Sequence, residues 1–269
     1  MRIGTGVKAT VFLGGGRITS ALVAGLRLAK YDKPIIVHDR HPSKLRQLKK
    51  QYGVTVELNL HQAVQRAKLL MIAVRPDSIS ELLQQMEINR PLTAVSLAAG
   101  IPLSNLRAHL GSPVRWARAM PSPVCRTAHG LTALTFDRTV SRTTKRELRS
   151  LFEKMGSVLE IPERQFDAFT VTYSSSHGYH ALAALAASAQ KLGLNRETAL
   201  TAAAHALADG ILSWREGKIP LAQLLHEATT PGGIAAAVMN EMDSSGYKRI
   251  IEQGLRAGTA RARKNVKRT

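Results

Sequence analysis

The chain has 269 residues, of which 44% are hydrophobic and 21% are charged. This composition is typical of a folded globular protein and excludes a disordered one. No apolar run reaches the roughly 18 residues that a membrane-spanning helix needs, and the single Cys125 excludes an internal disulfide. We therefore expect one or two domains, no signal peptide, a cytoplasmic location and no membrane partner.

The net charge of +19 is unevenly distributed along the chain. Residues 1–165 hold 26 Lys and Arg against 11 Asp and Glu, whereas residues 166–269 hold 12 against 8. Five of those twelve lie in a basic tail at 261–269. A basic surface attracts anionic cofactors and substrates, and also nucleic acid without sequence specificity. Aromatic residues make up only 4% of the chain and no nucleic-acid motif is present, so no specific nucleic-acid partner is expected.

A glycine-rich turn near the start of the chain is the first motif that carries chemistry. The apolar run 9–13 predicts a strand, three glycines at 14–16 break it, and helical spacing of apolar residues resumes at Ile18. A strand, a glycine turn and a helix together form the phosphate-binding unit of dinucleotide-binding domains, with the helix N-terminus facing the pyrophosphate. The third small position of this motif holds Thr19 instead of Gly or Ala.

The second expected strand, 34–38, is followed by residues that bear on the choice of dinucleotide. Asp39 stands about where an acidic residue accepts the ribose hydroxyls of NAD. Arg40 follows directly, together with His41, Ser43 and Lys44, and such a cluster suits the 2′-phosphate of NADP. The same residues also fit a solvated helix start. We favour NADP and leave NAD open.

Strands and helices alternate through the first 161 residues. Further strands are expected at 54–56, 69–74, 94–97, 113–119, 131–136 and 157–161, with helices at 43–52, 59–67 and 141–155. This alternation predicts an α/β fold with a doubly wound, Rossmann-type parallel sheet. Ligands of such sheets bind beyond the carboxyl ends of the strands, where this chain places loops of small residues.

The composition changes after Pro162. Strand patterns vanish, and the Ala-rich segments 181–192, 195–215 and 232–241 are helical, with Asn195 as a helix cap. These helices are apolar round much of their circumference, which one small domain in water does not tolerate. We expect a dinucleotide-binding domain at 1–161 and an all-α dimerisation domain at 162–269. The alternative is a monomer whose helices pack on its own sheet.

Seven short motifs follow one another at characteristic spacing. They are the glycines at 14–16, Ala73-Val74-Arg75-Pro76, Ser96–Ile101, Arg118-Ala119-Met120-Pro121, Asp167–Thr170, Lys191–Leu194 and Thr230-Pro231-Gly232-Gly233. In this order they resemble the pyrroline-5-carboxylate reductase family over essentially the whole chain. The resemblance implies a homodimer, often assembled into a ring of dimers, that transfers hydride from NAD(P)H to the C=N carbon of a cyclic imino acid in proline biosynthesis.

The resemblance also implies residues for two ligand sites. The expected cofactor residues are Gly14, Gly16, Arg17, Ile18, Asp39, Arg40, Ala73, Val74, Arg75, Pro76, Ala98, Ala99 and Gly100. The expected residues for an anionic imino-acid substrate are Met120, Ser122, Ser175, Ser176, Thr230, Gly232 and Gly233. The backbone N–H groups of Gly232 and Gly233 are expected to bind its carboxylate. No metal site is expected, because the histidines lack partners at metal-ligand spacing.

Four segments depart from the family pattern. Asn-Met after the glycines is here Arg17-Ile18, and Met-Pro-Asn-Thr-Pro is here residues 120–124, Met-Pro-Ser-Pro-Val. Ser-Gly-Ser-Gly-Pro-Ala-Tyr is here Tyr-Ser-Ser-Ser-His-Gly-Tyr at 173–179. The hydroxyl residues that follow Pro-Gly-Gly are here Ile234 and Ala235, which cannot hydrogen-bond an imine nitrogen through their side chains.

His177 and Tyr179 are the candidate catalytic residues. His177 could supply a proton or bind a second acidic group, or it could be a structural histidine, and Tyr179 matches the family tyrosine, with packing as its expected role. We expect an imine reductase. The alternatives are a same-fold oxidoreductase that acts on another small anionic substrate, and an NAD(P)-binding protein without catalysis.

Overall fold

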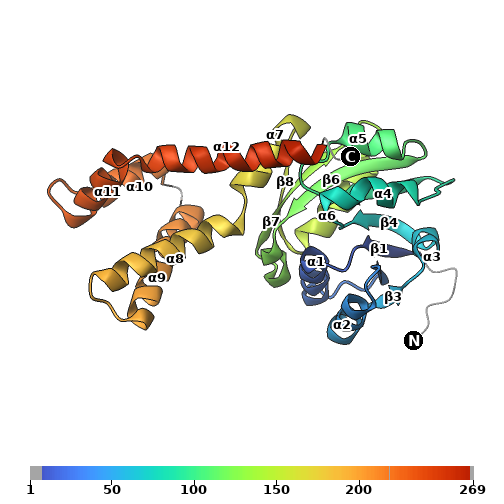
Figure 1. Cartoon of the computed structure of the whole chain (residues 1–269), viewed down its shortest axis with the longest axis horizontal. Helices are drawn as coiled ribbons and strands as arrows, with labels where there is room; N and C mark the ends of the chain where they lie inside the picture. The colour runs from blue at the N-terminus through green and yellow to red at the C-terminus, as the bar shows by residue number, and fades with distance from the viewer. Residues whose placement is uncertain (1–7, 218, 267–269) are drawn as a thin grey trace. The chain divides into compact units, whose positions relative to one another are not determined.

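The computed structural model describes residues 8–217 and 219–266, in which eight strands form one sheet (Figure 1). The strand order is β3-β2-β1-β4-β5-β6-β7-β8. The strands are β1 (Ala9–Leu13), β2 (Ile35–His38), β3 (Thr55–Glu57), β4 (Ala67–Ile72), β5 (Leu92–Ser96), β6 (Val114–Pro121), β7 (Gly130–Phe136) and β8 (Gly156–Glu160). The predicted Rossmann-type sheet is confirmed.

The α-helices alternate with these strands and then follow one another. They are α1 (Arg17–Leu28), α2 (Pro42–Tyr52), α3 (Leu60–Gln65), α4 (Ile79–Gln84), α5 (Leu103–His109), α6 (Arg142–Glu153), α7 (Glu163–Thr172), α8 (Ser175–Lys191), α9 (Arg196–Glu216), α10 (Leu221–Ala228), α11 (Ile234–Ser244) and α12 (Tyr247–Val266). Two 3₁₀ turns, η1 (Pro76–Ser78) and η2 (Pro123–Thr127), complete the described chain. The predicted cap is present: the Asn195 side chain accepts the N–H of Thr198 at 2.9 Å.

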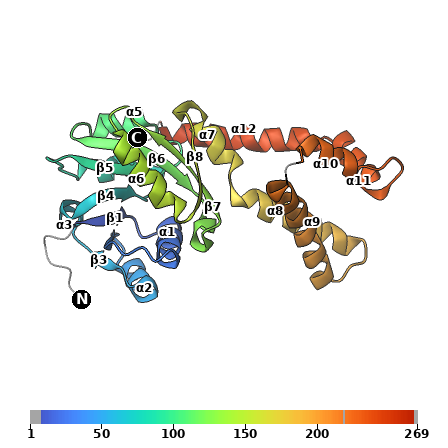
Figure 2. The same cartoon turned by 180° about the vertical axis from the view of Figure 1, so that it is seen from behind.

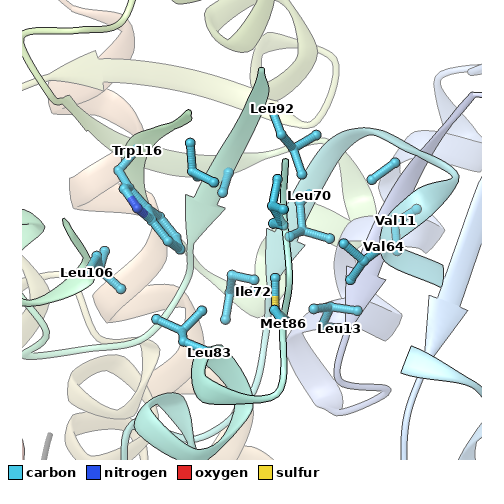
Figure 3. Packing of buried hydrophobic residues seen from close by; sticks show 14 of the residues in the cluster. Val11, Leu13, Val64, Leu70, Ile72, Leu83, Met86, Leu92, Leu106 and Trp116 are labelled. Atoms are coloured by element: carbon cyan, nitrogen blue, oxygen red, sulfur yellow. The ribbon is translucent and has the colours of Figure 1, made fainter. Parts of the chain in front are cut away.

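Helices cover both faces of the sheet, and successive residues of a strand point to opposite sides. In β1, Val11 and Leu13 belong to one buried cluster, with residues of α3, α4 and α5, and Figure 3 shows this cluster around Leu70 and Ile72. Phe12 belongs to the other cluster, with residues of α1, α2 and α6. Figure 2 views the same arrangement from behind, with α6 in front of the sheet. Burial on both faces explains why these strands read as continuous apolar runs.

The sheet departs from a wholly parallel pattern at one place. Strand β7 pairs antiparallel with β6, whereas the six other strand pairs are parallel. Only residues 122–129, with the turn η2, connect the two strands. A parallel pair needs a crossover of a dozen or more residues, so this short connection requires the reversal.

The chain divides into two compact units. One consists of the residues up to Tyr173 together with those from Gly258 onward, and the other of Ser174–Ala257. Helix α7 follows the boundary that the sequence places after residue 161, yet it belongs to the first unit. Folding of residues 1–161 as a separate domain stays a prediction.

The second unit leaves most of its large apolar side chains exposed. Of the twenty such side chains exposed in the described structure, seventeen lie between Tyr179 and Ile251. The buried apolar residues of this unit are three alanines, Ala186, Ala199 and Ala203. This unit therefore has almost no core of its own within one chain. No helix among the described residues is long and apolar enough to cross a membrane.

The C-terminal residues are helical, although the sequence suggests only a basic tail at 261–269. Residues up to Val266 continue α12, and residues 267–269 lie outside the described range. Within the first unit, a side chain at Gly100 would collide with the backbone of Ala262, and the Asn265 amide donates to the Ala99 carbonyl at 3.2 Å. These long-range contacts order the segment, and charge counting does not reveal them.

Replacing Gly25 tests how closely α1 approaches η2. A Cβ atom at this position would collide with the Cys125 carbonyl and lie 3.0 Å from Met155 Cγ. We expect Gly25→Ala to lower the free energy of unfolding by about 1–3 kcal/mol despite its better helix propensity. Gly254→Ala in α12 is the matched control, because no atom lies within 4 Å of its added Cβ. Urea unfolding measures both, and equal stability of the two variants would contradict the close approach.

Candidate functional site

A cleft of about 500 Å³ lies at the carboxyl ends of β1, β2 and β4. Seven of the thirteen expected cofactor residues line it: Gly14, Gly16, Asp39, Arg40, Ala73, Val74 and Arg75. The others, Arg17, Ile18, Pro76, Ala98, Ala99 and Gly100, are not among its lining residues. The cleft therefore stands where a doubly wound sheet binds its ligand.

The glycine turn is fixed by close backbone contacts. Gly14 has a φ of +109°, its N–H donates to the His38 carbonyl at 2.7 Å, and a Cβ there would lie 2.6 Å from the Ala73 carbonyl oxygen. A Cβ on Gly16 would meet nothing within 4 Å. The first glycine is thus required by the fold, whereas the last leaves open space at the N-terminus of α1.

Thr19 replaces the small residue of the motif without disturbing the turn. Its side chain is fully buried, and its hydroxyl donates to the Gly14 carbonyl at 2.5 Å. The hydroxyl therefore gives the buried Gly14 carbonyl a hydrogen-bond partner within the turn. This role needs the folded turn and could not be predicted from the residue type.

Asp39 is buried beneath the glycine turn. Its Oδ2 accepts the N–H of Gly15 at 2.7 Å, and its Oδ1 accepts the N–H of His41 at 2.8 Å. The His41 ring lies 2.8 Å and Lys44 Nζ 3.5 Å from the carboxylate. Burial opposes ionisation, but the hydrogen bonds from Gly15 and His41 and the Lys44 charge outweigh it and lower the pKa of Asp39 below its ordinary value of 3.8. The carboxylate is thus committed to the protein itself.

A cationic edge remains beside this buried carboxylate. Arg40 is exposed and forms no ion pair within the described part of the chain, and Lys44 and His41 line the cleft next to it. The sequence did not point to Ser78, Glu81, Leu82 and Gln85, which border the other side. Ser78 belongs to η1, Glu81 and Leu82 to α4, and Gln85 follows α4 directly, so it is the turn after β4 that brings that short helix to the cleft.

Arg118 links β6 to the start of α7. Its side chain is only 2% exposed, it lies 3.4 Å from both Glu163 and Asp167, and its guanidinium stacks 4.3 Å from the Phe166 ring centroid. Burial lowers the pKa of the guanidinium, and the carboxylates of Asp167 and Glu163 act in the opposite direction. Glu163 also accepts the N–H of Leu103 at 2.6 Å. The cluster therefore joins β6, α5 and α7.

The expected substrate residues fall into both compact units. Ser122 is buried, and its hydroxyl caps η2 by accepting the Val124 N–H at 3.1 Å. Met120 is half-buried in β6. Ser175, Ser176 and the candidates His177 and Tyr179 all lie in the first turns of α8, where the Ser174 and Ser176 hydroxyls are 2.6 Å apart and Tyr179 is 67% exposed.

The Thr230–Gly233 segment turns into α11 within the second unit. Gly232 has a φ of +74°, and the N–H of Gly233 donates to the Thr230 carbonyl at 2.9 Å. That N–H therefore has an acceptor within the turn in this structure, and its binding of a carboxylate stays a prediction. The first intrahelical bond is donated by Ala237 to the Gly233 carbonyl. The helix start therefore leaves the N–H groups of Ile234, Ala235 and Ala236 without an intrahelical acceptor.

Comparison with known proteins identifies the family. Residues 163–265 match the family model for pyrroline-5-carboxylate reductase dimerisation, and residues 10–100 match that for NADP oxidoreductase, coenzyme F420-dependent. A pyrroline-5-carboxylate reductase of Thermus thermophilus is 31% identical over 93% of this chain and 95% of that protein. The chain belongs to the pyrroline-5-carboxylate reductase family.

Solved structures of the pyrroline-5-carboxylate reductase family share this fold. The Coxiella burnetii enzyme has a TM-score of 0.84 at 26% identity, over 96% of this chain and 98% of that one. The Plasmodium falciparum enzyme, solved with NADP bound, has a TM-score of 0.86 at 21% identity, over 98% of this chain and all of that one. The helical half of this chain is thus a dimerisation domain of the family. Among the described residues, no group of three or more His, Cys, Asp or Glu could hold a metal ion.

The Asp39 contacts predict a pH-dependent loss of stability. We expect Asp39→Asn to lower the free energy of unfolding by about 1–3 kcal/mol at pH 7, because one amide oxygen cannot accept both sets of hydrogen bonds. Folding lowers the pKa of Asp39 below its ordinary value of 3.8. The extra stability of the wild type over Asp39→Asn is therefore fully present at pH values above 3.8, and it is lost as the pH falls through the pKa of the folded state. Denaturant unfolding between pH 7 and 2 measures it, with exposed Asp32→Asn as control. A pH-independent difference would contradict the buried ionised state.

Proposed function

We propose that this chain is an NADPH-dependent pyrroline-5-carboxylate reductase, which reduces the C=N bond of its cyclic imino acid to give proline. The carrying observation is the cleft at the carboxyl ends of β1, β2 and β4, with its glycine turn and cationic edge, in a chain 31% identical to a reductase of that name. The cofactor, when bound, supplies the hydride, and the protein binds and orients both reactants.

The preference for NADPH follows from where the charges lie. An acidic residue at the end of β2 selects NAD when its carboxylate is free to accept ribose hydroxyls. Asp39 instead binds Gly15 and His41, both within 2.8 Å. Arg40 and Lys44 stand exposed at the same edge of the cleft and suit a 2′-phosphate. Gly14, Gly16, Ala73, Val74 and Arg75 would hold the remainder of the dinucleotide.

The substrate carboxylate is assigned to the start of α11. Ile234 is 87% exposed, and its N–H and that of Ala235 face outward from the helix N-terminus, where the helix dipole favours an anion. Because neither side chain carries a hydroxyl, binding here depends on backbone groups. Thr230 and Gly232, in the turn that precedes the helix, and Ser175 and Ser176 of α8 complete the proposed polar surroundings. Met120 and Ser122 are also proposed to contact the substrate, because their motif resembles that of the family. His177 and Tyr179 remain candidate catalytic residues.

A homodimer is the proposed state in solution. The seventeen exposed apolar side chains of residues 174–257 would lose contact with water against a second chain, and residues 163–265 match a dimerisation family model. Further assembly into a ring of dimers and a cytoplasmic location are part of the same proposal.

The activity is tested by following NADPH oxidation by the purified chain with pyrroline-5-carboxylate and with larger cyclic imines. Turnover of pyrroline-5-carboxylate is the expected result. The side chains of Ile234 and Ala235 favour a second candidate, a same-fold oxidoreductase for another small anionic substrate, and turnover of other imines alone would establish it. Tight cofactor binding without any turnover would leave a non-catalytic NADP-binding protein.

Arg40 is predicted to distinguish the two dinucleotides. We expect Arg40→Ala to raise the dissociation constant of NADPH about tenfold or more, because a charged hydrogen bond contributes about 1.5–3 kcal/mol, and to change that of NADH little. Arg46→Ala in α2 is the control, since Arg46 is exposed and does not line the cleft. Fluorescence titration of the bound nicotinamide measures both affinities. An equal effect on NADPH and NADH would show that Arg40 does not meet the 2′-phosphate.

Gly16 and Gly14 provide a matched pair for the phosphate-binding turn. We expect Gly16→Ala to fold with nearly wild-type stability but to weaken NADPH at least tenfold, because its methyl group enters the space kept for the pyrophosphate. Gly14→Ala should instead destabilise the fold by about 1–3 kcal/mol, since its φ is +109° and its Cβ meets the Ala73 backbone. Unfolding and calorimetric titration separate the two effects. If Gly16→Ala binds NADPH as tightly as the wild type, the glycine turn does not contact the pyrophosphate.

A further inference from the structure

A second cavity, also of about 500 Å³, lies at the opposite ends of the strands from the cofactor cleft. It lies at the amino ends of β1 and β4, where Ala9 and Leu69 line it, and extends along α6. Leu13 and Gly14, at the far end of β1, line the cofactor cleft. Four residue steps at about 3.3 Å each separate the two ends of β1 by about 13 Å, so the two cavities are distinct.

The lining of this second cavity is strongly basic. Lys8, Lys33, Lys68, Arg146 and Lys154 line it, with Glu147 as the one carboxylate among its lining residues. None of the five cations has an ion-pair partner within the described residues, and Lys8 donates only to the Gln65 carbonyl, at 3.0 Å. Gln65 lies outside this cavity, so the Lys8 ammonium is directed away from it. The cations available there are Lys33, Lys68, Arg146 and Lys154. Like charges around one cavity repel one another, and a bound anion relieves that repulsion.

Helix α6 shows that this arrangement is selective. Its cations Lys145 and Arg149 pair with Glu160 at 3.7 and 3.5 Å, whereas Arg142, which does not line the cavity, has no ion-pair partner among the described residues. Arg146, on the same helix, and Lys154, just beyond it, lack such a partner and border the cavity. The two α6 cations beside β8 thus share one carboxylate, whereas Arg146 and Lys154 at the cavity have no ion-pair partner among the described residues.

The floor of the cavity is apolar and carries hydroxyl groups. Leu148 and Leu151 of α6 are buried there, and Tyr31 is 8% exposed, with its hydroxyl 2.9 Å from that of Thr10. Thr143 and Thr144 add two more hydroxyls in the first turn of α6, which contains no acidic residue. A cavity of this size with an apolar floor and a few polar groups is typical of a small-molecule site.

We propose that this cavity binds a phosphorylated small molecule with a planar or apolar body, of the size of a nucleoside phosphate. The cations hold its phosphate groups, the hydroxyls donate to its polar edges, and the leucines and the tyrosine contact its body. Such a site would account for part of the excess positive charge of residues 1–165, which is larger than the binding of one dinucleotide requires. An extended nucleic acid fits less well, because the one aromatic residue of the lining, Tyr31, is buried and offers no ring face for base stacking.

The test is calorimetric titration of the full chain with ATP in the presence of saturating NADP⁺, which keeps the cofactor cleft filled. ATP should bind once per chain, whereas adenosine and inorganic phosphate should each bind at least tenfold more weakly, since each supplies only half of the proposed contacts. Because binding is measured without turnover, failure here leaves the reductase proposal untouched, and an inactive but folded protein still gives a result.

The double variant Lys68→Ala/Lys154→Ala should weaken ATP at least tenfold and leave NADPH affinity unchanged. Lys49→Ala/Lys50→Ala on α2 is the matched control, because it removes the same charge from exposed residues that line neither cavity. Its ATP affinity should stay within about threefold of wild type.

Four outcomes would overturn the proposal. They are no ATP binding to the NADP⁺-loaded chain, equal weakening by the control variant, binding that NADP⁺ abolishes, and inorganic phosphate that binds as tightly as ATP. A single-stranded oligonucleotide is titrated in parallel. Binding at least a hundredfold tighter than that of ATP, and lost in Lys68→Ala/Lys154→Ala, would assign the cavity to a polynucleotide.

Discussion

The structure of the cofactor cleft depends on one buried charge, the carboxylate of Asp39. A carboxylate held away from water needs hydrogen bonds to stay ionised, and Asp39 takes them from Gly15 in the turn after β1 and from His41 in the turn after β2. Two separate loops are thereby fixed to one side chain. Because the Asp39 carboxylate is hydrogen-bonded within the protein, Arg40 and Lys44 are the groups after β2 that are placed to contact a substituent on the ribose. The hydrogen bonds that fix the turn are therefore also the reason for the proposed preference for NADPH.

The sequence predicts much of the fold because local and long-range preferences agree in the first half. Buried strands such as β1 and β4 read as apolar runs, and their ends are marked by glycine or proline. The alternation of strands and helices does not reveal the reversal at β7, which follows from the short η2 connection. Sequence prediction also fails where distant contacts decide, as at the end of α12, where Ala262 and Asn265 contact the loop at Gly100. A basic, alanine-containing segment does not reveal such a partner.

The two ligand sites differ in how much the sequence could say. Phosphate binding depends on a backbone geometry that glycines in the sequence indicate. Seven of the expected cofactor residues do line the cleft. Substrate binding depends on which polar groups remain unpaired, and that is decided by folding: the Ser122 hydroxyl caps η2, and the Gly233 N–H is used by Thr230. Polar groups of the expected type can thus already be hydrogen-bonded within the protein. The backbone N–H groups of Ile234 and Ala235, whose side chains are apolar, have no intrahelical acceptor and can bind an anion.

The start of the dimerisation segment shows why family boundaries and compact units need not coincide. The family match begins at residue 163, yet α7 belongs with the sheet. The buried Arg118 supplies the reason, since Glu163 and Asp167 are its two carboxylate partners and Phe166 covers its guanidinium. Removing α7 would leave the buried Arg118 cation inside β6 without these carboxylate partners, which is unfavourable because a buried charge needs partners. Helix α7 is therefore needed by the first unit as part of its core, whichever way the second unit assembles.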